Sequence, residues 1–156
     1  MTTQTTRARN PKVATGALAL AALLIAGFEG TRTHAYLDSV GISTICVGHI
    51  HNVHMGDVAT PEQCQQYLQG DLGAAYASVK HGLTHPQPDT RVAALTSLTF
   101  NIGTSAFLHS RVLRDINAGY IVQGCNDMLA WDHAGGRMIP GLLRRRQAER
   151  DLCLRS

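Results

Sequence analysis

Residues 29–49 read EGTRTHAYLDSVGISTICVGH, a stretch in which β-branched and aromatic residues are separated by turn-forming Gly, Asp and Ser. This pattern predicts short strands joined by turns, and so a small antiparallel sheet over residues 34–48. The same stretch carries Glu29, Asp38 and Thr44, which fit the spacing Glu-x8-Asp-x5-Thr. We expect Glu29 to leave a preceding helix, and Asp38 and Thr44 to lie on the small sheet or in its turn.

Two carboxyl groups of this kind provide the chemistry that glycoside hydrolysis needs. One protonated carboxyl donates to the leaving oxygen, while an ionised carboxylate acts directly or through a held water on the other side of the sugar ring. The apolar run before Glu29 would partly desolvate its carboxyl and favour the protonated form, whereas Asp38, beside Ser39 in a polar turn, should stay ionised. Two carboxylates at such a spacing also occur by chance, so this pattern alone does not establish an enzyme.

Beyond residue 60 the sequence predicts a helical body. Thr60, Pro61 and Gln63 supply an N-cap, a proline at the first helical position and a capping-box partner, so a helix should run over residues 61–80. Apolar residues recur near helical spacing over residues 89–102, and shorter helices are expected over 110–118, 121–134 and 141–154. A chain of 156 residues suits one folded domain, and the fold class is α+β.

The N-terminus joins a basic segment to a short apolar one. Residues 1–11 contain two arginines and no acidic residue, and residues 13–28 are an apolar run rich in Ala. A stable transmembrane helix needs about 20 strongly apolar residues. The run is therefore a cleaved signal peptide, a permanent anchor, or a marginal segment that exports the protein, holds it and later leaves the membrane. The Ala-x-Ala triplets lie inside the run, and the large apolar residues are few, which favours the third interpretation.

Four cysteines stand at wide spacings without a Cys-x-x-Cys pair, so neither a zinc ribbon nor a thioredoxin-like site is indicated. An even number of cysteines behind an export segment favours two disulfides. Three connectivities are possible. We expect Cys46 to pair with Cys64 and Cys125 with Cys153, because these pairs join segments that the predicted fold brings together. Buried free thiols are the alternative.

The net charge of +3 comes largely from basic residues at the two ends of the chain. It suits an acidic polymer but identifies no partner. The arginines of residues 144–146 lie on a predicted helix and form a solvated face, except that one of them is a candidate to pack toward Glu29. Neither aromatic platforms nor a recognition motif for nucleic acid is present, and no nucleic-acid partner is expected.

Residues 48–54 are rich in histidine. His49, His51 and His54 have no acidic or cysteine neighbour except Asp57. A metal site would need a more complete set of ligands. We therefore expect neither a metal nor a cofactor.

Further motifs accompany the Glu, Asp and Thr pattern in order along the chain. They are Glu29-Gly30, YLDSVG at 36–41, TICVGH at 44–49, FNIG at 100–103, Phe107, LRDIN at 113–117, Trp131, Gly135-Gly136, Gly141-Leu142, Arg145-Arg146 and Glu149. With these residues the chain resembles the T-even phage lysozyme family, glycoside hydrolase family 24, and within it the lambdoid endolysins with a signal-arrest-release N-terminus. The resemblance covers residue 28 to the end.

The resemblance implies a lysozyme-like fold, in which a cleft separates a small sheet lobe from a larger helical lobe. It implies an inverting muramidase that cuts the β-1,4 bond between N-acetylmuramic acid and N-acetylglucosamine in peptidoglycan, and so lyses the host cell. Glu29 would be the acid, Asp38 would hold the water or stabilise positive charge, and Thr44 would orient the water. His49 and Asn101 would bind substrate or support the cleft. The histidine-rich stretch departs from the family, which has a Gly-containing turn there.

The resemblance also divides the chain into a signal-anchor segment, residues 1–28, and a muramidase domain, residues 29–156. We expect residues 13–28 to export the protein to the host inner membrane, and a monomer to be released to the periplasm. Because Glu29 follows Phe28 directly, release would complete the active site. One rival is a non-catalytic, membrane-anchored wall-binding protein that tolerates loss of Glu29 and Asp38. Another is a basic DNA-binding domain with salt-dependent retention.

Overall fold

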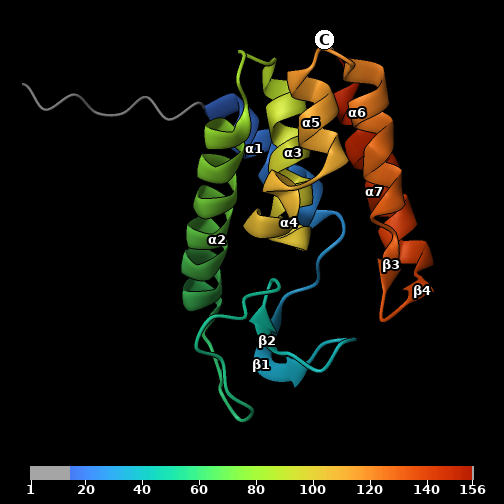
Figure 1. The fold of residues 1–156 in the computed structure, drawn as a ribbon. Helices are drawn as coiled ribbons and strands as arrows, with labels where there is room; N and C mark the ends of the chain where they lie inside the picture. The colour runs from blue at the N-terminus through green and yellow to red at the C-terminus, as the bar shows by residue number, and fades with distance from the viewer. Residues whose placement is uncertain (1–14, 156) are drawn as a thin grey trace, which may run out of the picture.

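The computed structural model describes residues 15–155, which fold into a helical body with a small sheet at one end (Figure 1). The elements are α1 (Thr15–Ala26), β1 (Arg32–Leu37), β2 (Ser43–Cys46), α2 (Pro61–Gly82), α3 (Asp89–Ile102), α4 (Thr104–Leu108), α5 (Arg111–Asn117), α6 (Ile121–Asp127), the 3-10 helix η1 (Met128–Ala130), β3 (His133–Ala134), β4 (Arg137–Met138) and α7 (Pro140–Cys153). This arrangement confirms the predicted α+β class.

Strands β1 and β2 form the predicted antiparallel sheet, with Tyr36 opposite Thr44. The turn between them is closed by Asp38, whose Oδ1 accepts hydrogen bonds from the N–H groups of Val40 (2.9 Å) and Ile42 (2.8 Å). An aspartate at the start of a turn satisfies backbone donors in this way. The side chain of Asp38 is thus held by its own turn.

Helix α2 begins where the sequence predicts. Thr60 Oγ1 accepts from the N–H of Gln63 (3.2 Å), and Gln63 Oε1 accepts from the N–H of Thr60 (2.8 Å), which is a complete capping box. The helix continues to Gly82, slightly beyond the predicted end. In Figure 1 it runs from the sheet end along one side of the helical body. It therefore links the two parts of the fold.

Both disulfides form between the predicted partners. Cys46 is bonded to Cys64, with a Cα–Cα distance of 5.1 Å, and Cys125 is bonded to Cys153 at 5.8 Å. The first joins β2 to the start of α2, and the second joins α6 to the end of α7. A disulfide stabilises a fold chiefly by restricting the unfolded chain. One bond secures the sheet and the other secures the C-terminal helix.

Helix α1 lies against α3. Its buried stripe consists of Ala17, Ala21 and Ile25, one helical turn apart, while Leu23 on another face is 72% exposed. Small residues in this stripe let two helices approach closely. Within residues 15–155, no helix is both long enough and apolar enough to cross a membrane.

The expected helix over residues 121–134 is shorter than predicted. Helix α6 ends at Asp127, η1 follows, and β3 and β4 then form a small hairpin. Gly135 and Gly136 both have positive φ, at 58° and 77°, which is the backbone of a two-residue hairpin turn. The Gly-Gly pair therefore turns the chain back rather than merely ending a helix. Helix α4, just after Gly103, was also not expected.

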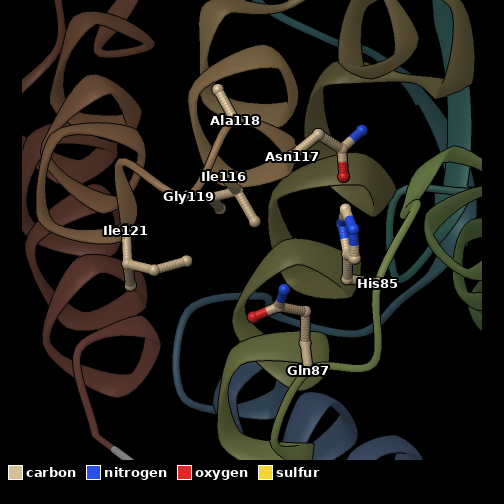
Figure 2. A pocket seen from close by; sticks show the side chains of 7 residues that line it. All are labelled: His85, Gln87, Ile116, Asn117, Ala118, Gly119 and Ile121. Atoms are coloured by element: carbon tan, nitrogen blue, oxygen red, sulfur yellow. The ribbon is translucent and has the colours of Figure 1, made fainter.

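A hollow of about 280 Å³ lies in the helical body beside the α5–α6 turn (Figure 2). Its polar side chains already have partners. Asn117 Oδ1 accepts from the N–H of Thr84 (3.0 Å), and Gln87 Oε1 accepts from Arg91 (2.7 Å). None of the residues predicted to be catalytic lines it, so this hollow is not the candidate active site.

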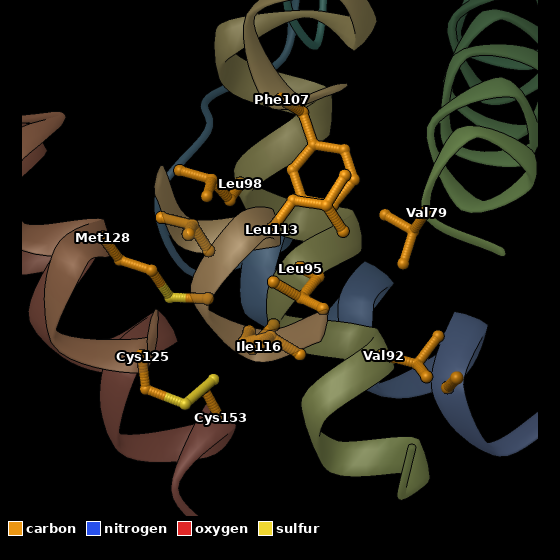
Figure 3. Close-up of a cluster of buried hydrophobic side chains, with 13 residues drawn as sticks. Val79, Val92, Leu95, Leu98, Phe107, Leu113, Ile116, Cys125, Met128 and Cys153 are labelled. Carbon is orange, nitrogen blue, oxygen red and sulfur yellow. A yellow bond between two sulfur atoms is a disulfide. The ribbon is translucent and has the colours of Figure 1, made fainter. Parts of the chain in front are cut away.

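Helix α3 is the centre of the core and contacts α1, α2 and α7. All its residues from Arg91 to Thr99 are buried. Leu95 and Leu98 pack with Phe107 and Ile116, beside the Cys125–Cys153 bond (Figure 3). A helix that is buried on all sides is closely packed, and it fixes the positions of the helices around it. Ser97 of this helix accepts a hydrogen bond from Arg145 of α7, next to Glu29.

Candidate active site

Glu29 is fixed by the end of α1. The N–H groups of Phe28 and Glu29 both donate to the carbonyl of Ile25, each at 2.9 Å. The side chain of Ile25 is fully buried against the core. The position of the Glu29 backbone therefore depends on how α1 packs on α3. Its carboxyl is one quarter exposed, at 25%.

Arg145 of α7 donates from Nη1 to Glu29 Oε1. The other donors of the same guanidinium are also used. Nε donates to Glu149 Oε1 at 3.1 Å, and Nη2 donates to the carbonyl of Ser97 at 3.2 Å. The sequence did not say which arginine of residues 144–146 packs toward Glu29, and the structure identifies Arg145. Its side chain is only 3% exposed.

Arg146 lies beside this contact and is fully buried. Its Nη2 donates to Asn101 Oδ1 (2.7 Å), and its Nε lies 3.0 Å from Glu149 Oε2. Burial lowers the pKa of Arg146 to about 10; the Glu149 carboxylate opposes this, Arg145 adds to it, and Glu29 opposes it. Asn101, predicted to be a cleft or supporting residue, is therefore a hydrogen-bond partner of a buried guanidinium.

Tyr36 lies on β1, opposite Thr44. Burial raises the pKa of its phenol, the Arg32 guanidinium opposes this, and the negative charges of Glu29 and Asp38 raise it further. Arg32 stands 4.4 Å from the centre of the Tyr36 ring. Sequence reasoning did not single out Tyr36 or Arg32 as site residues.

Thr44 is buried on β2, opposite Tyr36. Its Oγ1 donates to the carbonyl of Ile42 at 2.9 Å. A hydroxyl that donates in this way keeps lone pairs with which it can accept a hydrogen bond. The strand register thus brings Thr44 to the same side of the fold as Asp38, which closes the turn between the strands.

His49 attaches the loop after β2 to α2. Its Nδ1 lies 2.7 Å from Asp71 Oδ2, and its ring stacks on Tyr67 with centroids 4.1 Å apart. The side chain of His49 is 11% exposed. These contacts show a residue that fixes a loop, and neither Asp71 nor Tyr67 was found by sequence reasoning. Nowhere in residues 15–155 do three His, Cys, Asp or Glu side chains gather as a metal site would require.

Asp71→Asn is expected to lower the free energy of unfolding by about 1–3 kcal/mol, because it weakens a hydrogen bond between His49 and a carboxylate that is mostly shielded from water. Urea unfolding of the purified chain measures this change. Asp57→Asn is the matched control, since Asp57 pairs with His54 on the surface, where both are well exposed. Its effect should stay below about 1 kcal/mol. Equal losses from the two variants would contradict the assignment of His49 as a loop anchor.

Comparisons with known proteins extend over the whole site. The phage lysozyme family model matches residues 26–149. The SAR-endolysin of Enterobacteria phage P21 is 36% identical over 146 residues, which are 89% of this chain and 88% of that protein. Among solved structures, the muramidase domain of SpmX from Asticaccaulis excentricus has a TM-score of 0.77 at 30% identity, over 95% of this chain and all of that one.

The active form of the P1 phage endolysin Lyz has a TM-score of 0.76 at 26% identity, covering 86% of this chain and 83% of that chain. The family match includes Glu29, Asp38, Thr44 and the buried residues of α7 that hold Glu29. The matches in sequence and in fold both cover most of the chain, and they agree on the protein family. The chain belongs to the phage lysozyme family.

Proposed function

We propose that this chain is an endolysin that hydrolyses the β-1,4 bond between N-acetylmuramic acid and N-acetylglucosamine in peptidoglycan and so lyses the host cell. We place it in the T-even type, glycoside hydrolase family 24, with an inverting mechanism. The observation that carries this proposal is the contact of a partly exposed Glu29 with a buried Arg145, in a chain whose family match also includes Asp38 and Thr44.

In this proposal Glu29 donates its proton to the leaving glycosidic oxygen. Asp38, oriented by two backbone N–H groups, holds the attacking water or stabilises positive charge on the sugar ring. Thr44 accepts a hydrogen bond from that water and orients it. An inverting hydrolase keeps its two carboxyl groups wide enough apart for a water between them. Inversion therefore requires that the water reach the sugar from the Asp38 side.

His49 and Asn101 enter the proposal as supporting residues. His49 is held between Asp71 and Tyr67, and Asn101 accepts from Arg146. Each contact uses one polar atom of the side chain, Nδ1 of His49 and Oδ1 of Asn101. We infer that His49 fixes the loop beside the cleft and that Asn101 fixes the arginine pair of α7.

We further propose that residues 13–28 first act as a signal anchor in the host inner membrane, and that the released monomer acts in the periplasm. In this scheme residues 1–28 form the anchor segment and residues 29–156 the muramidase domain. The relative from phage P21 is named a SAR-endolysin, which supports this order of events. The packing of α1 on α3 supplies the physical reason, because it sets where Glu29 lies.

Analysis of the products tests the proposed bond. Purified sacculi are digested with the full chain, and the new reducing ends are reduced with borohydride and identified by mass spectrometry. Cleavage at the proposed bond converts the new ends to muramitol. New ends found as glucosaminitol would contradict the muramidase assignment. The absence of any new reducing end would favour the non-catalytic wall-binding protein.

A further inference from the structure

Glu149 is a fully buried carboxylate on α7. Its Oε1 accepts from Ser97 Oγ at 2.6 Å and from Arg145 Nε at 3.1 Å. Its Oε2 lies 3.0 Å from Arg146 Nε. A carboxylate removed from water destabilises a fold unless it is paired and hydrogen-bonded. Glu149 is compensated by the guanidinium groups of Arg145 and Arg146 on α7 and by the hydroxyl of Ser97 on α3.

The contacts of Glu149 determine the direction of Arg145. A guanidinium is planar and presents its five N–H donors in a fixed fork. Glu149 occupies Nε, and the carbonyl of Ser97 accepts from Nη2. With those two positions fixed, Nη1 can point in one direction only, and in that direction it meets Glu29.

The charges of Glu29, Arg145, Arg146 and Glu149 balance one another. Arg145 and Arg146 contribute two positive charges, and Glu149 contributes one negative charge. One positive charge remains, and Glu29 lies against it. Without the charge of Glu149, Glu29 would face two uncompensated guanidinium groups, which favour its ionised form. A general acid must instead be able to carry a proton.

We propose that Glu149, held by Ser97, is a positioning residue of the active site: it orients Arg145 toward Glu29 and limits the positive charge that Glu29 meets. The inference rests on the proposed function of Glu29 as general acid. A purely structural Glu149 would only attach α7 to α3. The two roles differ in their effect on the pH dependence of the reaction.

The groups that face Glu29 come from two sides. Arg145 and Arg146 act from α7, and Tyr36 acts from the sheet. Helix α1 carries no acidic or basic residue. Glu149 carries a negative charge and is fully buried, so it has no surface with which to touch a sugar. Its removal therefore changes the field at Glu29 without removing a group that touches the sugar.

Glu149→Gln tests the proposal in the full chain, because glutamine keeps the shape and can still accept from Ser97. Initial rates are measured on dye-labelled sacculi at several substrate concentrations and across pH, per folded molecule. We expect kcat to fall about 10- to 100-fold with KM unchanged. The alkaline limb of the pH profile should move to lower pH, because added positive charge favours ionised Glu29. A wild-type kcat and an unmoved limb would overturn the proposal.

Ser97→Ala decides the question if Glu149→Gln does not fold. This variant removes the 2.6 Å hydrogen bond and leaves every charge in place. We expect kcat to fall several-fold, with the alkaline limb unmoved. A kcat per folded molecule equal to that of the wild type would overturn the proposal by itself.

Two controls separate positioning from stability. Asp151→Asn changes a carboxylate of the same helix that is 57% exposed and pairs with Arg150, so rate and pH profile should stay unchanged. Val112→Ala shortens a fully buried side chain in α5 and should lower the melting temperature without moving the alkaline limb of the pH profile.

If the wild type produces no new reducing ends, the proposed function fails. If the wild type and Glu149→Gln behave alike, only this inference fails.

Discussion

Glu29→Gln is expected to lower the rate of peptidoglycan hydrolysis about 100- to 10,000-fold, which is the usual contribution of a positioned general acid. Glutamine has nearly the same volume as glutamate, and its carbonyl can still accept from Arg145. The fold should therefore persist while the proton is lost. The loss of turbidity of chloroform-treated Gram-negative cells measures the rate.

Glu62→Gln is the control for this experiment. Glu62 lies exposed in the first turn of α2, and it forms no salt bridge within residues 15–155. It should clear the cells at the wild-type rate. Unchanged clearing by Glu29→Gln would instead favour the non-catalytic wall-binding protein, in which neither Glu29 nor Asp38 is needed.

The second large effect is expected from leucines in the buried stripe of α1. Ala17 is 1% exposed and Ala21 is fully buried against the core, so neither site has space for a larger side chain. The double variant Ala17→Leu, Ala21→Leu should prevent α1 from packing on α3, because overfilling a closely packed interface forces the helices apart. Glu29, bonded to the end of α1, would then lose its contact with Arg145. Hydrolysis should fall at least about 100-fold.

The matched control places the same leucines on the exposed face. Ala19→Leu, Ala26→Leu raises the apolarity of the segment equally, yet both positions are exposed in the folded protein. Both double variants should stay longer in the membrane, because leucine favours the bilayer more than alanine does. After extraction in detergent, the exposed-face variant should regain activity and the buried-face variant should not. Recovery of both would show that packing of α1 is not required.

Much of the fold follows from local sequence signals. The capping box at Thr60 fixed the start of α2, and the pattern of turn-forming residues fixed the small sheet. The pairing of the cysteines also follows, because the order of elements brings Cys46 near Cys64 and Cys125 near Cys153. These features depend on short stretches of chain, which is why a sequence reveals them.

The parts that the sequence did not predict depend on tertiary packing. The choice of Arg145 among three arginines depends on which face of α7 meets α3. The partners of His49 lie on α2, about 20 residues further along the chain, at a helical phase that no motif marks. The role of Glu149 appeared only when its burial was known. The Gly135-Gly136 hairpin was missed because two glycines end a helix as readily as they turn a strand.

We propose that Glu29 becomes catalytic when α1 leaves the membrane and packs on α3. The most direct test compares membrane-held and released protein from one wild-type preparation, with the clearing rate of chloroform-treated cells measured per molecule in each fraction. The released protein should clear the cells, and the membrane-held protein should be at least about 100-fold slower. Equal rates in the two fractions would contradict the account.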